Sequence, residues 1–104
     1  MFFINQIVSK AGVPIRLPQE RWLHITEEHC EMAGFYYEVL ETVHTPDAIY
    51  TGGRAELIAI KHIGDGKYLA VVYKEISSDD GFIITAFLTR RVKSFERRTK
   101  IWPQ

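Results

Sequence analysis

Hydroxyl and cationic side chains follow one another at the end of an apolar segment of this chain. The segment 82–89 is rich in Phe and Ile and contains Thr85 and Thr89. It leads directly into Arg90 and Lys93. Hydroxyl donors beside guanidinium and ammonium groups suit a phosphate or a carboxylate. The alternative is a core strand followed by a solvated basic tail, which is the commoner arrangement of surface charge.

A histidine in an expected helix supplies a second group with chemical capacity. His24 lies one turn from Glu20 and from Glu28, which favours a surface ion pair and also suits an imidazole that does acid–base work. Arg21 lies three residues before His24, where it either adds a cation beside the imidazole or pairs with Glu28. His24 and His29 are five residues apart and lie on different faces of a helix. We therefore expect no metal site.

A lysine in a neighbouring strand adds a cation to the candidate anion site. Side chains alternate between the two faces along the segment 67–76. If the following turn pairs Ile76 with Gly81, Lys74 lies opposite Ile83 and shares a face with the two threonines. A slip of one residue would move the threonines to the other face. The alternative is that the threonines are present only because β-branched residues favour strands.

The composition describes one compact unit. With 104 residues, of which 46% are hydrophobic, the chain is long enough for one core and too short for two ordinary domains, so we expect a single domain over 1–104. No apolar run approaches the roughly 20 residues that span a bilayer. The first residues lack the features of a signal peptide, so we expect a soluble, cytoplasmic protein. Cys30 is the only cysteine, which excludes an internal disulfide, and we expect no cofactor.

The charges separate along the chain although the net charge is +0. Residues 1–50 contain three basic and seven acidic residues, whereas 51–104 contain ten basic and six acidic residues. The neutral total argues against strong nonspecific binding of nucleic acid by the whole molecule. The positive excess lies mostly in 89–100, so a local anion site is compatible with the neutral total.

The order of the expected elements predicts an α+β fold. Residues rich in β-branched and aromatic types mark strands at 1–8, 13–17, 55–63, 67–76 and 82–89. Helical apolar stripes mark 18–32 and 35–43. Tight turns join the last three strands, which imposes an antiparallel meander. We therefore expect two N-terminal helices packed on one face of this meander. The residues expected in the core include Trp22, Ile25, Phe82 and Ile84.

Several segments, in this order, resemble the small phage-associated proteins that are grouped with the barnase, EndoU, colicin and RelE nucleases. They are 20–25 with 29–31, then 45–49, 67–74, 80–89 and 101–103. The chain differs from the family pattern at Cys30, where proline is usual. The resemblance implies a RelE/barnase-like fold and a metal-independent ribonuclease of a phage, toxin or mobile element.

This chemistry needs a base for the 2′-hydroxyl, an acid for the leaving 5′-oxygen and cations for the phosphorane. We assign His24 as general base or acid, and the other expected catalytic residues are Lys74, Thr85 and Arg90. The expected substrate-binding residues are Arg21, Thr89, Lys93 and Tyr73, of which Tyr73 would stack a base or lie in the core. The expected partners are RNA and a cognate inhibitor protein, with no membrane.

Two other functions remain open at this stage. An RNA- or anion-binding module without catalysis would expose the basic tail with no imidazole nearby. An immunity or assembly protein of a mobile element would bury the tail in a partner. A nuclease would gather His24, Lys74, Thr85 and Arg90 in one groove.

Overall fold

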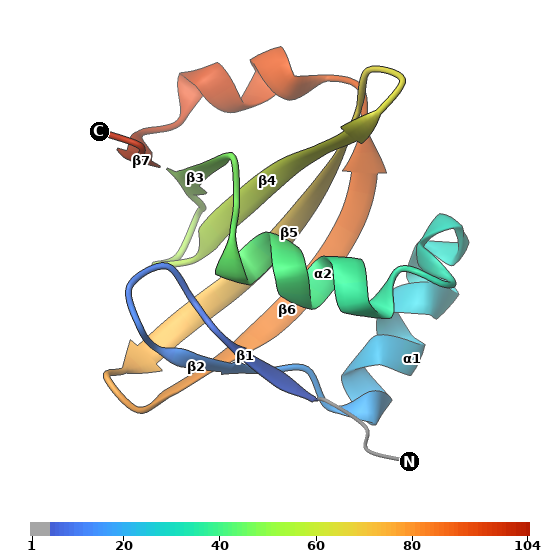
Figure 1. The fold of residues 1–104 in the computed structure, drawn as a ribbon, viewed down its shortest axis with the longest axis vertical. Helices are drawn as coiled ribbons and strands as arrows, with labels where there is room; N and C mark the ends of the chain where they lie inside the picture. The colour runs from blue at the N-terminus through green and yellow to red at the C-terminus, as the bar shows by residue number, and fades with distance from the viewer. Residues whose placement is uncertain (1–4) are drawn as a thin grey trace.

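The structure is a computed structural model, and it describes residues 5–104. Every strand in this range belongs to one seven-stranded sheet of order β1-β2-β6-β5-β4-β3-β7 (Figure 1). The strands are β1 (Gln6–Val8), β2 (Pro14–Arg16), β3 (Ala48–Thr51), β4 (Leu57–Gly64), β5 (Lys67–Ser77), β6 (Asp80–Thr89) and β7 (Lys100–Trp102). The first four residues of the strand expected at 1–8 lie outside the described residues.

The predicted fold class was wrong, because the sheet is mixed and larger than a meander. β2 pairs with β6 in parallel, through Arg16 opposite Phe82. β3 and β7, which the sequence analysis did not predict, pair with each other and extend the sheet beyond β4. These strands have only three or four residues, too few for a period of two to be recognised. The parallel contact joins segments that are distant in sequence, so no turn signal marks it.

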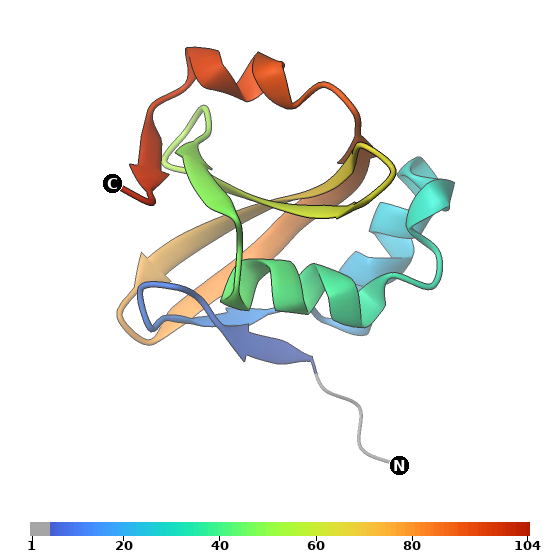
Figure 2. The same ribbon diagram turned by 45° about the horizontal axis from the view of Figure 1, so that its top comes forward.

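The helices lie on different sides of the sheet. They are α1 (Gln19–Glu28) and α2 (Tyr36–His44), with the short 3₁₀ helices η1 (Cys30–Met32) and η2 (Val92–Arg97). In Figure 1, α2 crosses in front of the sheet, while α1 lies beside β6. The turned view in Figure 2 shows η2 on the side opposite α2. The predicted basic tail is therefore partly a short helix and a strand. Within residues 5–104, no helix is both long and apolar enough to cross a membrane.

The two faces of the sheet are covered unequally. The inner face, toward α2, carries the fully buried Leu69, Val71 and Tyr73 of β5 and Ile83 of β6, which belong to the main core. The opposite, outer face has a smaller cluster in which Phe95 of η2 packs on the sheet. The members of this cluster on the strands are Ala48, Ile58, Ile60 and Ala70. Because η2 covers only part of the outer face, several β5 and β6 residues on this face are only half-buried, among them Lys74, Phe82 and Thr85.

A β-bulge sets which residues of β6 reach the outer face. Lys74 lies opposite Phe82 rather than Ile83, and Thr85 lies opposite Val72. Ile84 is the additional residue between these two pairs. Directly opposed residues share a face, so Lys74, Thr85 and Thr89 all lie on the outer face despite the wrong predicted register. The expected core residue Ile84 is only half-buried, and its neighbour Ile83 has no exposed surface.

Glycine at position 81 allows β2 to approach β6. A Cβ atom there would lie 2.5 Å from Cδ1 of Ile15 and 2.6 Å from the carbonyl oxygen of Lys74. Neither distance is compatible with a side chain, so only glycine fits between the strands. This close contact sets the position of Arg16, beside Phe82, and of α1, which follows β2 in the chain.

Candidate active site

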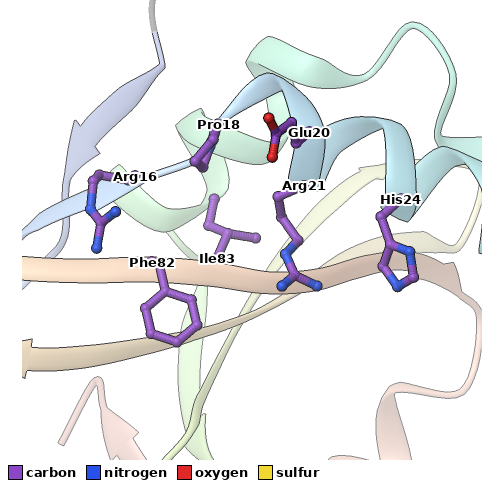
Figure 3. Close-up of a pocket in the computed structure, with 7 residues that line it drawn as sticks. All are labelled: Arg16, Pro18, Glu20, Arg21, His24, Phe82 and Ile83. Carbon is purple, nitrogen blue, oxygen red and sulfur yellow. The ribbon is translucent and has the colours of Figure 1, made fainter.

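A hollow lies between the first turns of α1 and the edge of β6, with a volume of about 420 Å³. We call it the first hollow. Its lining residues are Arg16, Pro18, Glu20, Arg21, His24, Phe82 and Ile83. Figure 3 shows Arg21 and His24 reaching from α1 toward β6, where Phe82 projects from the strand. Arg16 approaches the same strand from β2. The first hollow thus brings three basic side chains to an aromatic ring.

The cations of the first hollow differ in their partners. The Arg16 guanidinium contacts Asp80 Oδ1 at 2.9 Å from Nη2 and 3.0 Å from Nε, which offsets its charge. Among residues 5–104, no ion pair or hydrogen bond involves the side chain of Arg21. The guanidinium of Arg21, a predicted substrate-binding residue, therefore has no ion-pair partner in this range, although Glu20 lines the same hollow.

The imidazole of His24 is oriented by a carboxylate. His24 Nε2 lies 2.8 Å from Glu28 Oε1, one helical turn later. An ionised carboxylate only accepts hydrogen bonds, so Nε2 carries the proton of this contact. Nδ1 is then left to accept or deliver a proton. An imidazole with a carboxylate partner is one arrangement that general acid–base catalysis uses.

A row of side chains crosses the sheet beside the first hollow. Arg16, Phe82 and Lys74 lie at the same level of β2, β6 and β5, on the outer face. Lys74 is half-buried, and no ion pair in the described part of the chain involves it. Thr85 follows on the same face of β6. The predicted residues His24, Arg21, Lys74 and Thr85 thus flank one end of the outer face.

A second hollow, of about 690 Å³, lies at the other end of β6. It is lined by Tyr68, Arg90, Arg91, Val92, Lys93, Ser94 and Glu96. The Nη1 group of Arg90 donates a hydrogen bond to the carbonyl oxygen of Asp65, in the turn between β4 and β5. Thr89 accepts a hydrogen bond of 3.0 Å from the backbone N–H of Arg91. Thr89 therefore stabilises the turn after β6, and Arg90 connects this turn to the turn between β4 and β5.

The structure distributes the predicted site residues over three places. His24 and Arg21 line the first hollow, whereas Arg90 and Lys93 line the second. The four expected catalytic residues therefore do not share one hollow. Tyr73 is 1% exposed on the inner face, which leaves no surface for a base to stack on. Burial, and then the charge of Glu75, raise the pKa of the Tyr73 phenol, as expected for a core tyrosine.

Arg16 and Phe82 are the site residues that the sequence analysis did not identify. Arg16 ends a short extended segment, and nothing in its neighbours marks it as a partner of Phe82. Phe82 was assigned to the core because it belongs to a continuous apolar run, where the face of a side chain depends on the register. Within residues 5–104, no group of three or more His, Cys, Asp or Glu side chains is placed to hold a metal ion.

Comparison of the chain with protein-family models, with curated proteins and with solved structures found no match. The geometry of the two hollows and the resemblance described above therefore carry the functional argument.

Proposed function

We propose that the protein is a metal-independent endoribonuclease whose chemistry takes place in the first hollow. The observation that carries this proposal is the imidazole of His24, oriented by Glu28 at 2.8 Å and one turn from the unpaired guanidinium of Arg21. An aromatic ring can stack on the nucleobase of a nucleotide, and a cation beside the ring can bind its phosphate. The first hollow offers both contacts next to the imidazole.

The proposed reaction uses the 2′-hydroxyl of the substrate as nucleophile. Nδ1 of His24 takes the proton of this hydroxyl, and the oxygen attacks the adjacent phosphorus. Arg21 and Lys74 stabilise the negative charge of the phosphorane. The bond to the 5′-oxygen breaks, and this oxygen takes a proton from a water molecule that in turn receives the proton held by Nδ1 of His24. The product ends in a 2′,3′-cyclic phosphate, and the imidazole is neutral again. Thr85 serves as a hydroxyl donor to the phosphate. Arg90, which lines the second hollow, moves from the catalytic to the binding residues.

The family resemblance supports the same proposal from a different direction. The segment that contains Arg21 and His24 is one of those on which the resemblance to the barnase, EndoU, colicin and RelE nucleases rests. We propose that the chain is a member of that group, of phage or toxin origin. On this proposal it acts on cytoplasmic RNA and is held in check by a cognate inhibitor protein.

A specific observation also favours a second candidate function, an RNA-binding module without catalysis. Arg90 and Lys93 line a hollow whose lining residues include no histidine, although the ring of His62 lies 5.0 Å from that of Tyr68. The nuclease interpretation instead predicts that Arg90 lies with His24. Both functions use the outer face of the sheet. They differ in whether the phosphodiester bond is broken.

Cleavage of single-stranded RNA in excess EDTA separates the two candidates. The nuclease proposal predicts undiminished cleavage with EDTA, products that end in 2′,3′-cyclic phosphate, and no cleavage of a control with 2′-deoxyribose at every position. If RNA binds but stays intact, the RNA-binding module without catalysis remains as the function. Cleavage that needs added metal, or cleavage of the deoxyribose control, would contradict the mechanism.

A further inference from the structure

The second hollow has the composition of a nucleotide-binding surface without that of a catalytic one. Tyr68 lies half-buried against it, with the ring of His62 5.0 Å away. Arg91 and Lys93 line it, and among residues 5–104 no ion pair neutralises either side chain. An aromatic ring beside unpaired cations binds a base and its phosphate together.

The two hollows are related by the register of β5 and β6. Lys74 lies opposite Phe82, beside the first hollow, and Tyr68 lies opposite Thr89, at the second. Both pairs are on the outer face, because the residues of β5 between Tyr68 and Lys74 alternate without interruption. The two positions are six residues apart along β5, which corresponds to about 20 Å at about 3.3 Å per residue.

Side chains that suit a nucleic acid also occupy the surface between the hollows. Thr85 and Phe87 of β6 are half-buried on the outer face, opposite Val72 and Ala70. The ring of Phe87 lies 6.0 Å from that of His29, which follows α1. The outer face therefore presents an aromatic ring at each hollow, and the half-buried Phe87 between them packs in part against the smaller cluster that contains Phe95. Aromatic rings that are spaced along a sheet stack the unpaired bases of a single strand, and paired bases in a duplex do not reach them.

We propose that the second hollow is a nucleotide subsite and that one single strand of RNA extends across the outer face from the first hollow to the second. This inference rests on the proposed function for the identity of the ligand as RNA. It adds that the ligand is unpaired and that it spans both hollows. Tyr68 stacks a base, and Arg91 and Lys93 contact phosphates at a distance from the scissile bond.

Binding of 2′-O-methyl RNA tests the inference without cleavage, because the methylated hydroxyl cannot attack. The probes are a dinucleotide, an octanucleotide and a duplex of the same octanucleotide, each titrated at low salt. We expect the octanucleotide to bind at least about tenfold more tightly than the dinucleotide and than the duplex, since each further base that stacks on an aromatic ring adds to the affinity. Equal affinity for dinucleotide and octanucleotide would overturn the spanning strand, and preference for the duplex would overturn the stacking.

Variants of the second hollow test whether it provides the additional affinity of the octanucleotide. Tyr68→Leu should weaken octanucleotide binding by about 5- to 100-fold, the range for loss of one stacked base. The exposed pair Arg91→Ala and Lys93→Ala, made together, should weaken it as well and lower its salt dependence. The matched control is Arg97→Ala, an exposed cation of η2 outside the lining of the hollow. If both sets of variants lose no more affinity for the octanucleotide than Arg97→Ala does, the second hollow is not a subsite and its cations act only through the general positive charge of the surface.

The proposed function and the subsite fail in distinguishable ways. Tight, length-dependent binding without cleavage of ordinary RNA would remove the nuclease and keep the subsite. Cleavage of RNA with an affinity that does not depend on length would keep the nuclease and remove the subsite.

Discussion

The first and the second hollow lie at opposite ends of the same strand and hold different chemistry. The first contains an imidazole with a carboxylate partner and a guanidinium without one. The second contains more cations and a tyrosine but is lined by no histidine. On the proposed function, positive charge alone does not distinguish the catalytic from the binding surface. The distinguishing feature is then a titratable group that contacts a carboxylate.

The two hollows are also formed by different kinds of secondary structure. The first hollow is formed on α1 and β6, so its residues are held by a helix and a central strand. The second is formed mostly by the turn after β6 and by η2. Residues on regular elements are positioned more precisely than residues on loops. This difference supports the proposal that the bond is cleaved at the first hollow, and that the second hollow only binds RNA.

The largest expected effect is on the imidazole of the first hollow. His24→Ala should lower the cleavage rate by about 10² to 10⁴, the range for loss of one general acid or base. The side chain of His24 is 54% exposed, so folding should be unaffected. The control is His44→Ala, because His44 bonds the carbonyl oxygen of Val8 and lines neither hollow. Single-turnover cleavage measures both, and equal rates for the two variants would break the distinction between the hollows.

Truncation of Ile83 and of its neighbour Ile84 tests which face of β6 is buried. Ile83 is fully buried on the inner face, so Ile83→Ala should lower the free energy of unfolding by about 2–5 kcal/mol. Ile84→Ala should cost clearly less, because Ile84 is half-buried at the bulge. Urea unfolding of both variants gives the two values. A larger loss for Ile84 would mean that the faces of β6 are reversed, and with them the position of Phe82.

Lys74 tests whether the outer face extends the first hollow. Lys74→Ala should lower the cleavage rate by about 10² to 10³, comparable to the loss of one group that stabilises transition-state charge. RNA affinity should change much less, since the charge it stabilises develops during the reaction. The exposed Lys67, at the start of β5, provides the control variant Lys67→Ala. A loss in affinity equal to the loss in rate would make Lys74 a binding residue only.

The smallest expected effect concerns Tyr73, on the opposite face from Tyr68. Burial raises the pKa of Tyr73 above its ordinary 10.0, so the folded protein retains a proton that the unfolded chain loses. Its contribution to stability is present below pH 10 and is lost as the pH rises above that value. Tyr73→Phe should therefore make the alkaline loss of stability shallower, as measured by urea unfolding from pH 8 to 11.

RNA binding should be unchanged by Tyr73→Phe. Weakened binding with unchanged alkaline stability would return Tyr73 to the substrate-binding residues.

The long elements were predictable from the sequence because their patterns are local. The apolar stripe of α1 and the strand-length runs of β5 and β6 each extend over ten residues or more. The short β3 and β7 carry too few residues for a pattern, and the parallel pairing of β2 with β6 depends on contacts distant in sequence. The mixed sheet could therefore not be deduced from local periodicity.

The candidate site shows the same division. His24 and its neighbours Arg21 and Glu28 lie within two helical turns, so their proximity follows from the sequence. The bulge at Ile84 shifts the partner of Lys74 by one residue, and no turn signal marks it. The separation of Arg90 from His24 depends on the direction of α1 along β6, which is a tertiary property. Side chains on one element could be grouped from the sequence, whereas side chains on different elements could not.

The assignment of cleavage to the first hollow can be tested by a structure of the protein with an octanucleotide that carries a single 2′-O-methyl group at the scissile position. We predict a phosphate in the first hollow, within hydrogen-bond distance of the Arg21 guanidinium, with the methylated 2′-oxygen beside Nδ1 of His24. It also predicts a base against Tyr68 in the second hollow. An octanucleotide bound on any other surface, or bound at the second hollow with the first hollow empty, would contradict the assignment of cleavage to His24.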